Sequence, residues 1–232
     1  MKNGRITICT AGYSHKHGFI RIYPTKMNMS LRRWNIVKVP LERNPQDSRK
    51  ESWKIEGSKS EWDTLNEKVE ILGTLPRENH LSLIANLEDG CITELNEAKR
   101  SLGIIKPVIE ECSLSEQDEY EGTIQMTLSG RPQPKIREQY KMVPRVRYRC
   151  AHCKASGSHD QQVLEWGFYE WFRKNPGKEK QVWENAQIFS ESHEIYFFVG
   201  SIFRHWSSFS IISVLRLPKG PVAKPLSPLK KF

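Results

Sequence analysis

The sequence predicts a mainly β protein with accessory helices, an α+β chain built from two small β domains. Short stretches in which apolar and polar residues alternate recur between turn residues, which is the pattern of half-buried strands. Hydrophobic residues make up 38% and aromatic residues 10% of the 232 residues, enough to bury a core. No heptad pattern persists along the chain, so a coiled coil is excluded.

The first half of the chain holds strand candidates at the spacing of a small barrel or sandwich. A turn at 15–18 joins the first two, and Asn44-Pro45 stops the third. The expected strands are 5–10, 19–23, 35–41, 53–55 and 69–72.

The middle of the chain changes to a helical and acidic character. Segment 78–86 fits a helix, and a second helix is expected over 91–102, because apolar residues recur on one of its faces. Gly103 suits the position just after a helix, and Pro107 cannot continue one. Segment 110–121 is polar and acidic and is expected to be a loop.

Segment 129–134, rich in Gly and Pro, marks a domain boundary. We expect a first domain over 1–130, with the acidic helical part as an insertion, and a second β domain with amphipathic helices over 131–217. Residues 218–232 hold four prolines and four lysines and are expected to be a flexible basic tail. The elements expected in the second domain are strand 143–150, helices 161–174 and 182–189, and a hairpin of strands 195–201 and 209–217.

Charge is segregated along the chain, whose formal net charge is +9. Residues 1–50 hold 11 Lys/Arg and 2 Asp/Glu, whereas residues 51–130 hold 7 Lys/Arg and 17 Asp/Glu. Residues 131–217 are again basic, with 14 Lys/Arg and 8 Asp/Glu. Basic surfaces bind polyanions in a salt-dependent way. The alternative is that the basic blocks neutralise the acidic middle within the fold.

Several protein classes are excluded by what the sequence lacks. No run approaches the ~18 apolar residues of a membrane span, and the first ten residues lack the apolar stretch of a secretory signal. Five cysteines without framework spacing indicate a reducing compartment, so we expect a cytoplasmic protein. The absence of P-loop, GxGxxG, HExxH and GxSxG motifs argues against NTPases, dinucleotide enzymes, zincins and α/β-hydrolases.

Cations interleaved with aromatic residues indicate a nucleic-acid-binding surface. Phosphates need cations, and unpaired bases stack on flat rings, which contributes ~1–3 kcal/mol per base. A strand that presents Phe19, Arg21 and Tyr23 on one face would offer both. The alternative is that the rings are core and the arginines are only solvated. The candidate residues are Arg21, Tyr23, Lys26, Arg32, Arg33, Trp34, Arg49, Lys50, Trp53, Arg145, Arg147 and Arg149.

Cys150 and Cys153 have the C-x2-C spacing of one half of a zinc site, because two thiolates at this spacing can reach one tetrahedral ion. A structural Zn²⁺ needs two further ligands. The alternative is a pair of reduced thiols at a strand end. The candidates for the further ligands are His159 and His205, with His152 and His193 in reserve.

Asp47 and Glu51 are two carboxylates that could bind a metal ion in a nuclease. Arg49 lies between them and no third acid completes a catalytic set, so we expect a salt-bridge network in a loop instead. His15 and His17 lie in the predicted turn and are expected to be exposed rather than to act as acid and base.

Short segments of both halves carry a family resemblance. They are 19–24 (FIRIYP), 47–53 (DSRKESW), 148–150, Cys153, 158–159, 165–166 and 196–200. In these the sequence resembles the dual OB-domain family of prokaryotic genome-conflict and antiphage defence loci. The resemblance implies two OB-like β-barrel domains and nucleic-acid binding within a defence complex. Where the resemblance leads us to expect an acidic residue after Trp166, this chain has Gly167.

We therefore expect an accessory subunit of a defence-type complex that binds single-stranded or structured RNA or DNA. Its other partners would be protein subunits and not a membrane, and we expect no enzymatic activity. Two alternatives remain. One is an interaction subunit whose acidic middle docks on a basic partner without touching nucleic acid. The other is a metal-dependent nuclease.

Overall fold

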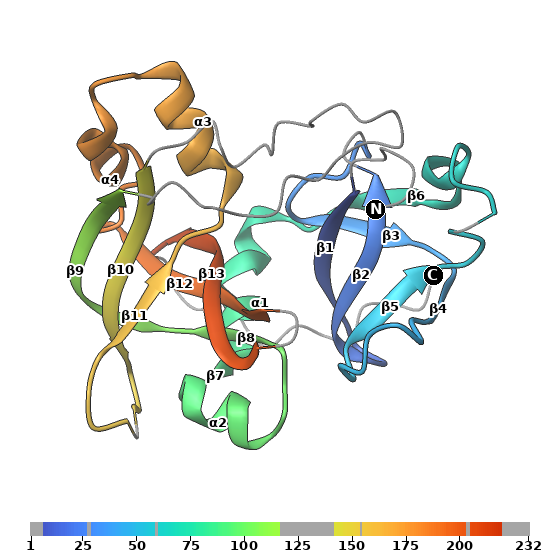
Figure 1. The fold of residues 1–232 in the computed structure, drawn as a ribbon, viewed down its shortest axis with the longest axis horizontal. Helices are drawn as coiled ribbons and strands as arrows, with labels where there is room; N and C mark the ends of the chain where they lie inside the picture. The colour runs from blue at the N-terminus through green and yellow to red at the C-terminus, as the bar shows by residue number, and fades with distance from the viewer. Residues whose placement is uncertain are drawn as a thin grey trace, which may run out of the picture.

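A computed structural model describes residues 7–26, 29–58, 60–116, 142–153, 155–202 and 205–219. It shows two β units that lie next to each other, with short helices between them and at their edges (Figure 1). The predicted mainly β class is confirmed. The described strands form four separate hydrogen-bonded sheets, and none of these closes into the barrel that we expected for each domain. Within the same residues, no helix is long and apolar enough to cross a membrane.

The larger sheet of the first unit has the strand order β1-β2-β5-β4. β1 (Thr7–Ser14) and β2 (Gly18–Lys26) form an antiparallel hairpin around the predicted turn. Gly18 has a φ of 70°, which suits glycine because it has no Cβ. β5 (Ser52–Ile55) pairs with β2 in parallel, and β4 (Leu41–Arg43) pairs with β5 at the sheet edge.

The smaller sheet of the first unit pairs β3 (Asn35–Lys38) with β6 (Glu70–Thr74). The predicted single strand 35–41 is thus divided between two sheets. Pro40 lies at the break, and its missing N–H cannot continue a ladder. The 3-10 helix η1 (Leu65–Lys68) precedes β6 in the chain.

The segment between the units begins with the predicted helix 78–86, which the structure divides in two. It consists of the 3-10 turn η2 (Arg77–Asn79) and α1 (His80–Asn86), followed by the short strand β7 (Glu88–Asp89). Figure 1 shows α1 between the two β units.

The predicted helix 91–102 is shorter than expected. α2 (Ile92–Glu97) ends early, and β8 (Leu102–Ile105) begins where the helix was expected to finish. Gly103 was expected just past a helix but lies inside β8. A Cβ there would lie 2.5 Å from Leu95 Cδ1, so glycine allows β8 to pack closely against α2.

The predicted acidic loop 110–121 is wrong in its first part. β9 (Pro107–Glu116) is a strand that pairs with β10 (Met142–Cys150) along most of its length. Its acidic residues face arginines across the ladder, as in the ion pair of 2.7 Å between Arg147 and Glu111. The alternate apolar residues of β9 pack against the core of the second unit. Cross-strand charge pairing therefore stabilises a strand whose composition indicated a loop.

The second unit adds β11 (His159–Gln162) to β10, and α3 (Trp166–Lys174) follows. The predicted helix 161–174 therefore begins later than expected, because its first residues belong to β11. The long hairpin of two apolar strands is confirmed. The remaining elements are η4 (Glu179–Gln181), α4 (Val182–Asn185), β12 (His193–Ile202) and β13 (His205–Pro218).

Sheet pairing joins the acidic middle of the chain to the second unit. β8 pairs with β12, and β9 pairs with β10, so residues 102–116 share the sheets of the C-terminal strands. The expected first domain extended to 130. The expected boundary at 129–134 and the expected tail from 220 onward lie outside the described residues.

The two units are packed very differently. The second unit contains a cluster of eighteen buried residues between its sheets and helices α2, α3 and α4. The cluster of the first unit contains three, Ile55, Trp62 and Leu65. A third cluster crosses the junction and joins Phe19 of β2 with residues of α1, β8, β12 and β13.

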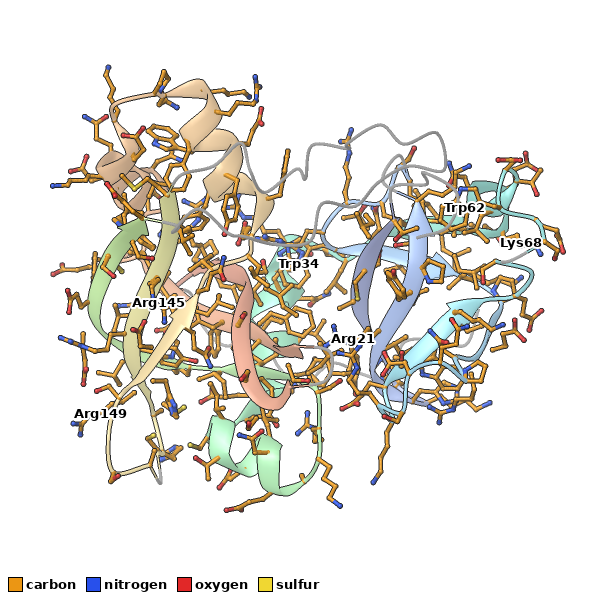
Figure 2. The ribbon with its side chains drawn as sticks, viewed as in Figure 1. Arg21, Trp34, Trp62, Lys68, Arg145 and Arg149 are labelled. Carbon is orange, nitrogen blue, oxygen red and sulfur yellow. The ribbon has the colours of Figure 1, made fainter. Side chains whose placement is uncertain are left out.

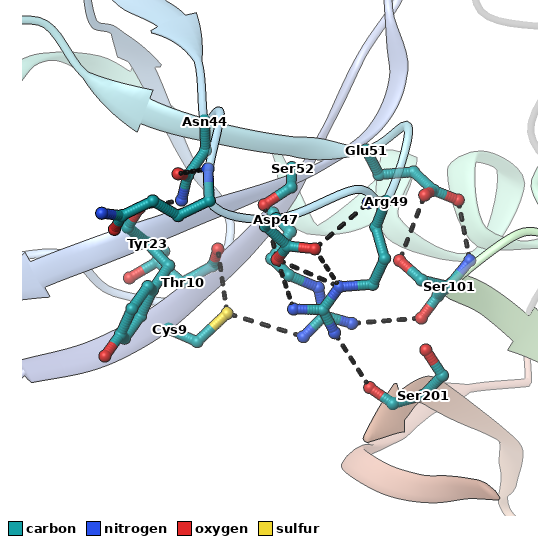
Figure 3. A network of polar contacts seen from close by, with 12 residues as sticks. Cys9, Thr10, Tyr23, Asn44, Asp47, Arg49, Glu51, Ser52, Ser101 and Ser201 are labelled. Carbon is teal, nitrogen blue, oxygen red and sulfur yellow. Dashed lines mark hydrogen bonds and ion pairs between the residues drawn. The ribbon is translucent and has the colours of Figure 1, made fainter. Parts of the chain in front are cut away.

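A buried polar network also joins the units (Figure 3). Arg49 is 8% exposed, forms an ion pair with Asp47, and donates from Nη1 to the carbonyl of Ser201 at 3.2 Å. Arg21 is 7% exposed and donates from Nη2 to the carbonyl of Ser101 at 3.1 Å. The Ser101 amide donates to Glu51 Oε1 at 2.8 Å. The salt-bridge network predicted for this loop is therefore present, and its residues also bond to the backbone of the second unit.

Removal of the Asp47 carboxylate tests this network. Asp47→Ala leaves the buried guanidinium of Arg49 without its counter-charge, and breaking a buried pair costs ~3–5 kcal/mol. We expect urea unfolding at pH 7 to show a loss of that size. Glu42→Ala removes the partner of Lys54 at a more exposed pair and should cost under about 1 kcal/mol. Equal losses in the two variants would contradict the role of Asp47.

The lowered pKa of Asp47 implies a loss of folding stability in acid. Burial alone would raise the pKa of Asp47, but hydrogen bonds from Arg49 and Ser52 outweigh it and hold the pKa below its ordinary 3.8. The unfolded chain therefore binds this proton more readily than the folded one. The stabilisation that Asp47 provides is complete at a pH above the ordinary pKa of 3.8. It is lost as the pH falls through the lower pKa that Asp47 has in the folded chain. We expect the gap in unfolding free energy between wild type and Asp47→Ala to shrink from pH 7 to pH 3.

Candidate metal centre and basic groove

Three cysteines and a histidine from separate parts of the second unit converge on one point. Cys91 precedes α2, Cys150 ends β10, Cys153 follows in the next turn, and His159 begins β11. One ligand atom of each lies within 4.8 Å of the others, so the four could hold a metal ion. Cys91 and Cys150 are buried, and the other two are half-buried.

The distances between the donor atoms fit one tetrahedral ion. Cys91 Sγ lies 3.7 Å from Cys153 Sγ, and Cys153 Sγ lies 3.3 Å from His159 Nε2. Bonds of ~2.3 Å to sulfur and ~2.0 Å to nitrogen give tetrahedral edges of about 3.8 and 3.6 Å. A disulfide would need about 2.05 Å between sulfurs. The donor set therefore suits metal coordination and not a covalent link.

The surroundings of the cluster also suit thiolate ligands. The Thr93 amide donates to Cys91 Sγ at 3.4 Å, and the Ile92 amide donates to the Cys150 sulfur. Burial raises the pKa of Cys150 to about 12, with a further contribution from its cysteine neighbours. A bound cation would reverse this balance, because metal ligation requires the thiolate.

The sequence identified three of these four ligands. Cys150, Cys153 and His159 lie in the cluster, and Cys91 takes the place that we assigned to His205. His205 begins β13, and its side chain lies outside what the structure describes. The reserve candidate His152 is exposed, and His193 Nδ1 lies within hydrogen-bond distance of two serine hydroxyls. Cys91 has no short-range spacing signal, since only the packing of α2 against the second unit brings it to the site.

The arginines predicted on β10 are engaged in ion pairs. Arg145 pairs with Asp160 at 3.0 Å, Arg147 with Glu111 at 2.7 Å, and Arg149 with Glu110 at 3.0 Å. Figure 2 shows Arg145 and Arg149 on the side of the second unit that faces away from the first, whereas Trp34 and Arg21 lie between the units. The predicted residues therefore do not form one surface.

Several predicted residues of the first half hold the structure together. Arg21 and Arg49 are buried in the polar network, so phosphates cannot reach them. Arg33 donates to Glu165 Oε1 at 2.9 Å and to Ser213 Oγ at 2.7 Å in the second unit. Lys26 Nζ donates to the Asp63 carbonyl.

The predicted aromatic residues have different surroundings. Trp34 stacks on the His80 ring at 3.8 Å, and Tyr23 is half-buried with its hydroxyl 3.3 Å from Thr7 Oγ1. Trp53 is half-buried, with the Arg43 guanidinium 4.0 Å above its ring and the His17 ring at 5.0 Å.

A cavity of about 960 Å³ opens on the first unit and extends to the junction, where Ile104, Phe198 and Leu215 of the second unit also line it. Its walls are mainly aliphatic, and aromatic rings including Tyr13, Trp34 and Trp53 contribute to them. No carboxylate lines it within the part of the chain that the structure describes. Its cationic lining residues are Lys16, Arg32, Arg33 and Lys38.

Comparison with known families divides the chain in two. Residues 2–81 match a domain of unknown function (DUF8758), and residues 91–230 match a second domain of unknown function (DUF8757). The first match ends near the start of α1 and the second begins just before α2, which agrees with the pairing of β8 and β9 in the second unit. No curated protein gives a significant match. Nor does any solved structure.

Proposed function

We propose that this chain, which belongs to the DUF8757 family, binds single-stranded nucleic acid on the first unit. One observation carries the proposal: a groove at the β1–β2 hairpin, edged by cations and aromatic rings, whose described lining holds no carboxylate. The described side of this groove offers both the charges and the flat surfaces that a strand needs.

The cations that support the proposal are the exposed ones. Lys16 and Arg32 line the groove. Lys50 is not in the lining, but its carbonyl accepts from Arg43, whose guanidinium lies over the ring of the lining residue Trp53. All three are exposed, and no ion pair within the described ranges joins them to a carboxylate. Their charge is therefore available to phosphates, unlike that of the β10 arginines.

Two aromatic rings of the groove lining support the proposal. Tyr13 is 40% exposed, with His15 at 5.5 Å, and the half-buried ring of Trp53 has the Arg43 guanidinium at 4.0 Å and the His17 ring at 5.0 Å. Bases stack on such rings only where they are unpaired, so a single strand or a loop suits this face better than a duplex. Arg43 adds a planar cation on which a base can also stack.

The metal centre serves this function indirectly, as a structural zinc site. Three thiolates and one imidazole are a donor set that Zn²⁺ favours, and four protein ligands leave no open position for catalysis. When bound, Zn²⁺ would join α2 to β10 and β11 and so stabilise the second unit. Its reduced thiols agree with a cytoplasmic location.

The role as an accessory subunit of a defence-type complex stays a prediction that rests on the family resemblance. The nuclease alternative has less support, because Asp47 is paired with Arg49 and Glu51 accepts from Ser101. The interaction-subunit alternative predicts a purified protein without salt-dependent binding to oligonucleotides.

Metal analysis tests the zinc site. We expect about one zinc per purified chain, and almost none in Cys91→Ala, because three ligands hold the ion poorly. A chelator should lower the melting temperature of the wild type and leave that of Cys91→Ala unchanged. Cys112→Ala is the matched control, since Cys112 is half-buried and outside the cluster. Zinc-free protein that melts as the wild type does would contradict a structural ion.

Salt titration tests the phosphate contacts. Arg32→Gln and Lys50→Gln should each weaken binding of a labelled single-stranded oligonucleotide several-fold, and should each reduce the log–log salt slope by about 0.7. Arg147→Gln should leave the slope unchanged, because its charge is paired with Glu111. A slope near zero in the wild type would exclude phosphate neutralisation.

Substitution of two tryptophans separates stacking from core packing. Trp53→Ala should cost ~1–3 kcal/mol of oligonucleotide binding with a smaller loss of folding stability. Trp62→Ala removes a ring that is 8% exposed in the core cluster and should cost ~3–5 kcal/mol of folding free energy. If Trp53→Ala reduces binding only in proportion to the unfolded fraction, Trp53 is a core residue. Tyr23→Ala, measured in the same way, tests the stacking role predicted for Tyr23.

A further inference from the structure

We propose that the cavity of the first unit binds one molecule with an unbranched alkyl chain and an anionic head group. This ligand would occupy the groove in which we propose nucleic-acid binding and would use the same cations, so the two ligands would compete. The proposal does not depend on nucleic-acid binding. It rests on the size of the cavity, the character of its walls and the charges at its edge.

The groove is large and apolar, and it is partly open to solvent. Its lining includes residues of the packed junction cluster, such as Phe19 and Ile84, and Ile55 of the first unit's own cluster. Its volume of about 960 Å³ lies in the range of ~300–1,000 Å³ that is typical of ligand pockets.

The walls select an alkyl chain over a nucleobase. Aliphatic side chains from both sheets and the segments between them line the cavity, among them Ile22, Ile36, Val37, Leu41 and Val69. The hydroxyls of Thr10 and Thr25 lie 3.0 Å apart and bond each other, and Thr25 also donates to the Ile8 carbonyl. Among the described residues, none of the buried unpaired polar side-chain atoms belongs to the lining. The polar edges of a base would be left unsatisfied against these aliphatic walls, so a base would be confined to the aromatic rings at the edge of the groove.

The edge of the cavity selects a negative charge. Lys16 and Arg32 are exposed, and within the described ranges neither is in an ion pair. Lys38 is 77% exposed and lies 3.8 Å from Glu70, which is a weak contact. The described lining holds no carboxylate, and Lys16 and Arg32 would therefore provide most of the attraction for a head group such as a carboxylate or phosphate.

One wall is held in place before any ligand arrives. Trp34 has a φ of 73°, a conformation that bulky residues rarely adopt. Its ring stacks on the His80 imidazole at an angle of 11°, and His80 Nε2 lies 2.9 Å from the Leu75 carbonyl. A strained residue fixed in this way at a cavity wall agrees with a ligand site.

Calorimetric titration of the full chain with octanoate, decanoate and dodecanoate, below their micelle concentrations, tests the proposal. Each methylene that enters the cavity should tighten binding about fourfold, so two carbons give roughly 15-fold, at about one molecule per chain. The methyl esters, which keep the chain and lose the charge, should bind more weakly. Absence of binding, or affinity that does not change with chain length, would overturn the proposal.

Variants locate the head group. Arg32→Gln should weaken dodecanoate several-fold and leave its methyl ester unchanged, whereas Lys178→Gln, an exposed cation of the second unit, should change neither. Equal effects of Arg32→Gln on acid and ester would contradict the assignment of the charge. Flotation with vesicles of anionic phospholipid then identifies the source. Flotation that Arg32→Gln weakens assigns the site to a lipid acyl chain, and binding of dodecanoate without flotation assigns it to a free carboxylate.

Discussion

The buried guanidinium groups of Arg21 and Arg49 are the interaction on which the rest of the structure depends. Both arginines belong to the first unit, and both donate to backbone carbonyls of the second, at Ser101 and Ser201. A guanidinium loses its hydration in such a place, and pairing must offset the loss. Nε of Arg21 has no hydrogen-bond partner among the described residues. Asp47 provides the counter-charge for Arg49 and thereby fixes the loop between β4 and β5.

The contacts between the units remove several cations of the basic N-terminal block from the surface. Eleven cations in the first fifty residues suggest a broad polyanion surface, yet Arg21 and Arg49 are buried and Arg33 is bonded to Glu165. The charge that remains exposed is concentrated near the β1–β2 turn and the cavity edge. Likewise, the arginines of β10 neutralise the acidic strand β9. Much of the charge segregation along the chain therefore serves cohesion of the fold.

Alternating strands bounded by turns were predictable, as the β1–β2 hairpin, β10 and the β12–β13 hairpin show. β9 was missed because its acidic residues are stabilised by arginines on a strand that is distant in sequence. Three members of the candidate metal cluster were predictable from local spacing, and Cys91 was not, because its position depends on the packing of α2. The burial of Arg21 was also not predictable from the sequence, because the carbonyl that accepts its hydrogen bond belongs to Ser101 of the other unit.

The two units differ in how they are built. The second unit has the large core and the four-residue cluster that could hold a metal ion. The first unit has a small core of its own, an open cavity and exposed cations, and it is the unit to which we assign binding in the proposal. The junction cluster and the buried arginines join the two units.

Photocrosslinking of a single-stranded oligonucleotide, read by mass spectrometry of the crosslinked peptides, tests the location of binding most directly. Crosslinks at Tyr13, His17 or Trp53 are the result that the groove of the first unit predicts. Saturable binding with crosslinks only on the β10 face of the second unit would contradict it.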